Sequence, residues 1–142
     1  MSYTIKSTLL ALCVFSSFSV AGDEKHDTRV TLDLNPAEKA ALKKEMRQML
    51  ASIQGIMTGL GIEDRELIIR SARQSGNQMA RATPESLTKK LPPAFKQIGG
   101  PTHMMFEELA IRAETDDMDM LASFTAGLMK QCLTCHSMFK AD

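Results

Sequence analysis

Apolar residues recur along most of the chain at the three- and four-residue steps that are typical of amphipathic helices. The first such stripe predicts a helix over residues 36–60. Its apolar positions are Leu42, Met46, Met49, Ile53, Ile56 and Leu60. Asn35 is placed to be the N-cap of this helix, with Glu38 as the second member of a capping box. Gly61 is placed to end the helix.

Three further helices are predicted after the first. A second helix is expected from about residue 63 to the residue before Pro84, followed by a connector over 84–100 with room for a short helix. A proline pair within the connector, and then the run Gly99-Gly100-Pro101, are expected to break helical structure. The remaining helices are predicted over residues 102–114 and 117–139. Four amphipathic helices without a convincing strand predict an all-α fold, specifically an antiparallel four-helix bundle.

The first residues are typical of a secretory signal peptide, predicted over residues 1–21. Lys6 precedes a short apolar stretch, and Ser19-Val20-Ala21 is a small-residue cleavage site. A membrane anchor is the alternative, but the stretch is short for a span. A lipoprotein anchored through Cys13 is a further alternative, disfavoured because Leu12 is too large for the usual motif. The protein is therefore expected in the periplasm, without a membrane span after cleavage.

The rest of the chain is predicted to be a flexible lead-in over residues 22–34 and one domain over residues 35–142. The formal net charge is zero, which gives no reason to expect a nucleic-acid partner. Loss of the signal peptide would leave two cysteines, Cys132 and Cys135, in an oxidising compartment. A disulfide across a two-residue gap would constrain little chain, so these cysteines are expected to have another role.

The sequence Cys132-Leu133-Thr134-Cys135-His136 has the pattern C-x-x-C-H, which is the attachment motif of c-type haem. On a helix, Cys132 and Cys135 are neighbours on one face, where both sulfurs can bond to the vinyl groups of one porphyrin edge. His136 is on the same side and is predicted to be the proximal axial ligand of the iron. The motif therefore predicts one covalently bound haem c.

Three alternatives to haem attachment fit the cysteine pair less well. A thioredoxin-type redox pair lies at a helix N-terminus after a strand, whereas this pair lies near the end of the last predicted helix. A structural zinc site needs four ligands, and His26 and His103 are too few and too scattered to complete one. Chance is disfavoured by the signal peptide, because c-type haem is attached after export.

A haem-attachment motif near the C-terminus, on the fourth helix of a bundle of about this size, resembles the class II cytochromes c. This group includes cytochrome c′ and cytochrome c-556. The resemblance covers essentially the whole chain after the signal peptide, in pattern more than in identity. Its specific part is the C-x-x-C-H motif followed by Phe139-Lys140, where the family usually has an aromatic residue and then Arg. Lys140 keeps the positive charge but lacks the planar guanidinium, so a role in shielding the proximal face is in doubt.

The resemblance implies that a residue of the first helix approaches the other face of the iron. A Met there gives a six-coordinate electron carrier, whereas Leu or Phe leaves an open site for small gases. Met46 is the preferred candidate and Met49, one turn away, is the other, with core packing as the alternative for each. Met57 is further along the helix and is less suited.

Other polar residues are candidates for contacts with the haem. His103 is a second candidate for the distal ligand, although a helix cap or a hydrogen-bond partner for a haem propionate is the preferred interpretation. Arg47 and Gln48 flank the candidate methionines and could reach the propionates, with a solvated face as the alternative.

Two functions are consistent with these residues. The first is a periplasmic electron carrier, not an enzyme, that exchanges electrons with redox partner proteins. The alternative is a five-coordinate haem protein that binds nitric oxide or carbon monoxide at an open distal site. Peroxidase-like catalysis is not expected, because no distal His–Arg pair is placed to support it. Family members often form homodimers through their first two helices, so a homodimer is a candidate assembly.

Overall fold

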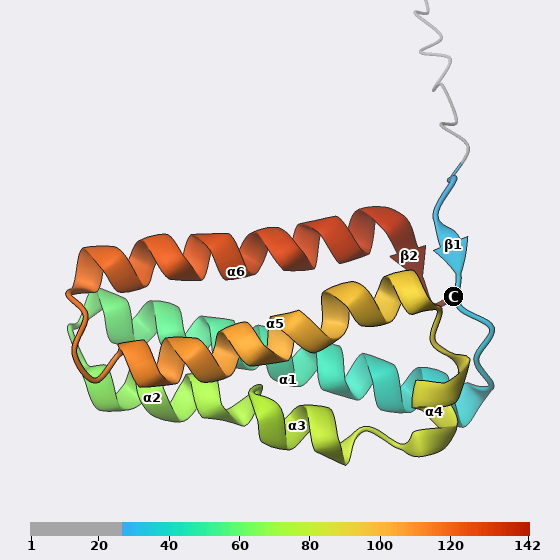
Figure 1. Cartoon of the computed structure of the whole chain (residues 1–142), viewed down its shortest axis with the longest axis horizontal. Coiled ribbons are helices and arrows are strands. Elements are labelled where there is room, and N and C mark those ends of the chain that lie inside the picture. Colours follow the sequence, from blue (N-terminus) through green and yellow to red (C-terminus); the bar gives the residue numbers. More distant parts are fainter. Residues whose placement is uncertain (1–26) are drawn as a thin grey trace, which may run out of the picture.

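The computed structural model describes residues 27–142, and the predicted signal peptide lies outside the described residues (Figure 1). The described part is mostly helical, with six helices and a single two-stranded β pairing. The helices are α1 (Pro36–Gly61), α2 (Arg65–Gln74), α3 (Asn77–Ala82), α4 (Glu85–Lys90), α5 (Pro93–Arg112) and α6 (Met118–Met138). The strands are β1 (Val30–Thr31) and β2 (Phe139–Lys140). The predicted all-α class is confirmed.

Helix α1 begins at the predicted capping box. The Asn35 side chain accepts a hydrogen bond from the Glu38 backbone N–H, and the Glu38 carboxylate accepts one from the Asn35 N–H, both at 2.9 Å. Lys90 at the end of α4 forms an ion pair with the same carboxylate at 2.8 Å. The helix ends at Gly61, as predicted, but the left-handed residue of the following turn is Glu63, with φ 57°. The N-terminus of α1 is therefore capped, and the Lys90–Glu38 ion pair also links it to α4.

The predicted second helix is two helices, α2 and α3, with a break at Ser75 and Gly76. Asp64 rather than Glu63 is the N-cap of α2, and its side chain accepts a hydrogen bond from the Leu67 N–H at 2.9 Å. The Ser75 carbonyl does not continue the helical ladder and instead bonds the His103 ring of α5. A long-range contact to α5 thus replaces a local bond, which sequence periodicity alone does not reveal.

The predicted break at Gly99-Gly100-Pro101 is wrong, because α5 runs without interruption through this run. A proline inside a helix loses one backbone hydrogen bond, but the helix continues where burial offsets that loss. Burial is extensive here, since Phe95, Thr102, His103 and Phe106 all lie inside the protein. The proline pair does mark a boundary, because Pro92 separates α4 from α5 and Pro93 is the first residue of α5.

The long helices lie lengthwise beside one another, with α1 against α2, α2 against α5 and α5 against α6 (Figure 1). Glycine allows a close approach of α1 and α2, because a Cβ at Gly59 of α1 would lie 2.7 Å from Cγ1 of Ile68 in α2. The main core lies between these helices. Its fully buried residues include Ile56, Ile68, Phe106, Leu109, Leu121 and Leu128.

Residues 27–34, before α1, belong to the fold, which differs from the flexible lead-in expected over residues 22–34. Of this segment the structure describes residues 27–34, and β1 pairs in parallel with β2 so that Val30 lies opposite Phe139. Leu32 and Leu34 are buried in a second apolar cluster. That cluster also contains Leu42, Leu87, Leu91, Phe95 and Phe139. The chain before α1 thus packs against the end of α6.

Candidate functional site

A cavity of about 670 Å³ opens between α1, α5 and α6 and is lined by residues of both apolar clusters. Ligand pockets in proteins commonly have volumes of about 300–1,000 Å³, so the cavity can hold a large cofactor. Its apolar walls include Met46, Met49, Ile53, Leu91, Phe95 and Ile98. Most of the surface that lines the cavity is apolar.

The C-x-x-C-H motif lies on the last turns of α6 and faces this cavity. Cys132, Cys135 and His136 all line it, as the predicted attachment and ligand roles require. Both cysteines are half-buried and neither forms a disulfide. Burial raises the pKa of both thiols, which differs from the low thiol pKa of thioredoxin-type pairs. The two sulfurs are thus protonated and available at the wall of an apolar cavity.

The candidate distal methionines lie on α1 and line the same cavity. Met49 is only 8% exposed and belongs to the main core, whereas Met46 is partly buried and packs against both apolar clusters. Met57 is 51% exposed and does not line the cavity. Arg47 lines the cavity from an exposed position, while Gln48 is exposed and outside the lining. The structure therefore brings Met46, Met49 and Arg47 to the motif and leaves Gln48 and Met57 apart.

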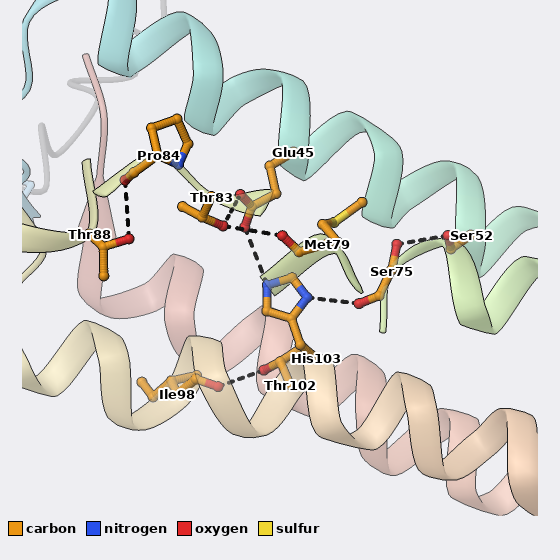
Figure 2. A network of polar contacts seen from close by, with 10 residues as sticks. All are labelled: Glu45, Ser52, Ser75, Met79, Thr83, Pro84, Thr88, Ile98, Thr102 and His103. Carbon is orange, nitrogen blue, oxygen red and sulfur yellow. Dashed lines mark hydrogen bonds and ion pairs between the residues drawn. The ribbon is translucent and has the colours of Figure 1, made fainter. Parts of the chain in front are cut away.

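His103 is not a helix cap, because α5 continues on both sides of it. The residue lines the cavity and is 6% exposed. Its Nδ1 atom lies 2.7 Å from the Ser75 carbonyl oxygen, and its Nε2 atom lies 3.3 Å from Oε1 of Glu45 (Figure 2). Both ring nitrogens therefore have partners within the protein.

The two partners of His103 constrain its protonation. A carbonyl oxygen and an ionised carboxylate can only accept, whereas a neutral imidazole has one N–H to donate. Both hydrogen bonds can therefore form only if the His103–Glu45 pair carries one proton more than a neutral imidazole and an ionised carboxylate. Burial lowers the pKa of His103, but the hydrogen bonds to Glu45 and Ser75 outweigh it, so the pKa is raised overall. The raised pKa and the two acceptor oxygens thus favour the protonated form of the His103 ring.

Further hydrogen bonds hold this pair in place. The Thr83 hydroxyl donates to Oε2 of Glu45 at 3.1 Å, so both carboxylate oxygens have partners (Figure 2). The hydroxyls of Ser52 and Ser75 lie 2.7 Å apart in the core. The network joins α1 and α5 to the chain on either side of α3. Sequence reasoning missed Glu45, whose signal is a charged residue on the apolar stripe of α1, and Ser75, which carries no such signal.

The segment around β1 contributes charged groups near the motif. Arg29 donates from Nη1 to the His136 carbonyl oxygen at 3.4 Å, a contact that sequence reasoning missed. Lys140 forms ion pairs with Asp142 at 2.8 Å and with Asp27 at 3.4 Å, and the pairing with Asp142 contributes most to raising its pKa. Lys140 is thus paired with two carboxylates, one before β1 and one after β2.

Comparison with protein-family models, curated proteins and solved structures finds no match to this chain. Within residues 27–142, no group of three or more His, Cys, Asp or Glu side chains is arranged to hold a metal ion. None of the helices in this described part has both the length and the apolar character needed to cross a bilayer.

Proposed function

We propose that this chain is an exported monohaem c-type cytochrome that carries electrons. One observation carries the proposal: Cys132, Cys135 and His136 line a large apolar cavity together with two methionines from another helix. Free thiols on one helical face suit the two thioether bonds to a porphyrin edge. His136 follows directly and offers the proximal imidazole. The residues present thus fit a haem c.

The chain's own residues would determine the properties of this centre. Bound in the cavity, the haem supplies an iron that gains and loses one electron. The apolar walls exclude water, and Met46 or Met49 offers a soft sulfur that favours reduced iron and raises the potential. Arg47 offers a guanidinium to a propionate carboxylate. No general acid or base is needed, so an enzymatic role is not proposed.

The proposal extends to the arrangement of the helices and to the compartment. We infer that α1, the broken segment α2–α3, α5 and α6 form an antiparallel four-helix bundle, a fold that builds cofactor sites from side chains on facing helices. The signal peptide predicted over residues 1–21 supports a periplasmic location. Its partners there would be redox proteins, and a homodimer is the proposed candidate assembly.

Gas binding is the second candidate function, and the packing of the methionines favours it. Met49 is part of the main core and Met46 contacts both apolar clusters, which is the role expected of methionines that fill space. If neither sulfur binds the iron, the distal side is an apolar pocket suited to nitric oxide or carbon monoxide. The same cavity thus serves either function, and ligation decides between them.

The test is to produce the full chain together with the c-type maturation machinery and to record absorption spectra in both oxidation states. A low-spin reduced spectrum that carbon monoxide does not alter supports the electron carrier. A high-spin spectrum that shifts with carbon monoxide supports gas binding. Absence of haem absorption would contradict both functions.

Covalent attachment is tested separately by haem staining after denaturing electrophoresis. Changing both Cys132→Ser and Cys135→Ser should abolish the stained band, because no thioether bond can form. Leu133→Ala is the matched control, since Leu133 lies between the cysteines and its side chain is 73% exposed. A stained band that survives both cysteine changes would contradict attachment through this motif.

A further inference from the structure

The cavity is lined by two histidines from different helices, and these differ in exposure and in hydrogen bonding. His136 belongs to the haem-attachment motif and is exposed on α6. His103 is buried on α5, and each of its ring nitrogens faces an oxygen atom. Imidazole is the commonest metal ligand in proteins, so a histidine in a haem cavity competes for the distal position unless it is held elsewhere.

We propose that Glu45 is a positioning residue that keeps His103 from binding the iron and so reserves the distal side for a methionine or a gas. This inference rests on the proposed function. The Ser75 carbonyl oxygen holds Nδ1 at 2.7 Å, which leaves Nε2 as the only nitrogen that could reach a metal. The Glu45 carboxylate is the hydrogen-bond partner of that nitrogen, with Oε1 at 3.3 Å.

The surroundings of Glu45 support this role. Thr83 donates to the second carboxylate oxygen at 3.1 Å, which restrains the carboxylate beside the ring (Figure 2). The Ser75 carbonyl is available because the chain leaves the helical path between α2 and α3. Glu45 also directly precedes Met46, so one turn of α1 supplies both the group that holds His103 and the candidate ligand.

The test compares haem-loaded variants by absorption and electron paramagnetic resonance spectroscopy. In Glu45→Ala the ring loses its Nε2 partner, and we expect a low-spin signature of two axial imidazoles, a lower reduction potential and loss of carbon monoxide binding if the parent protein binds it. Glu45→Gln should retain the parent spectrum, because its amide can donate to Nε2 while Nδ1–H donates to Ser75. The double variant Glu45→Ala with His103→Leu should lack the new signature.

Two results would overturn the inference: a Glu45→Ala protein with the parent spectrum, or a double variant that keeps the new signature. His103→Leu alone gives a further test that does not depend on the folding of Glu45→Ala. It should leave the parent spectrum unchanged, and an altered one would mean that His103 already binds the iron. A parent protein without haem absorption would instead contradict the proposed function.

Discussion

Met46 on α1 and His136 on α6 line the same cavity, although they come from opposite ends of the described chain. This relationship predicts a specific effect of Met46→Leu on the haem-loaded protein. If Met46 binds the iron, the variant should lose the methionine-to-iron charge-transfer absorption and its reduction potential should fall, because the thioether favours reduced iron. Met49→Leu is the matched control and should retain the band. Loss of the band in Met49→Leu alone would assign the ligand to Met49.

The raised pKa of His103 predicts a pH dependence of stability. A group whose pKa is higher in the folded state stabilises the protein fully below its unfolded pKa, and this contribution is lost as pH rises through the folded value. The free energy of unfolding of the parent relative to His103→Gln should therefore fall as pH rises above about 6.5, the ordinary pKa of histidine. Urea denaturation of both proteins measures this difference, and a difference that grows with pH would contradict the assignment.

The close approach of α1 and α2 predicts a large effect of one added methyl group. In Gly59→Ala the new Cβ would meet Ile68 Cγ1 at 2.7 Å and the Asp64 carbonyl oxygen at 2.9 Å. The second of these atoms belongs to the backbone and cannot rotate away, so we expect a loss of about 1–3 kcal/mol in the free energy of unfolding.

Gly127→Ala is the control for this substitution. Gly127 lies within α6 and its added Cβ would meet no atom within 4 Å, so helix propensity predicts a gain of about 0.5–1 kcal/mol. Denaturant titration of the two variants should move the midpoints in opposite directions. Equal effects would show that the α1–α2 contact is looser than described.

The capping box predicts that Asn35→Ala costs about 1 kcal/mol of stability. The substitution removes the acceptor for the Glu38 N–H, while the bond from the Asn35 backbone to the Glu38 side chain can still form. Asn35→Ser is the matched control, because its hydroxyl can accept the same bond. A thermal unfolding midpoint that falls equally in both variants would attribute the loss to something other than the cap.

The elements that the sequence predicts best are those defined by local signals. The cap at Asn35, the end of α1 at Gly61 and the start of α6 after Asp117 all depend on residues within one turn of the boundary. The apolar stripe of α1 places Met46 and Met49 on the inner face, where both line the cavity. Local chemistry and helical period suffice for these features.

The features that the sequence did not predict depend on distant partners. The break at Ser75 is matched by the ring of His103, and the continuity of α5 through Pro101 follows from burial on its inner face. The docking of β1 requires Phe139 at the other end of the described chain. Such contacts leave little trace in a local pattern, because either partner alone is compatible with a loop.

The pairing of Val30 with Phe139 has a kinetic consequence. Contacts between residues far apart in sequence carry a large loop-closure cost and tend to slow folding. This pairing joins the two ends of the described chain, so we expect it to form late, after the helices have collapsed. Cys132 and Cys135, the proposed haem-attachment residues, precede Phe139 by less than two helical turns. Under the proposed function, both thiols would therefore stay accessible for haem attachment until this last pairing forms.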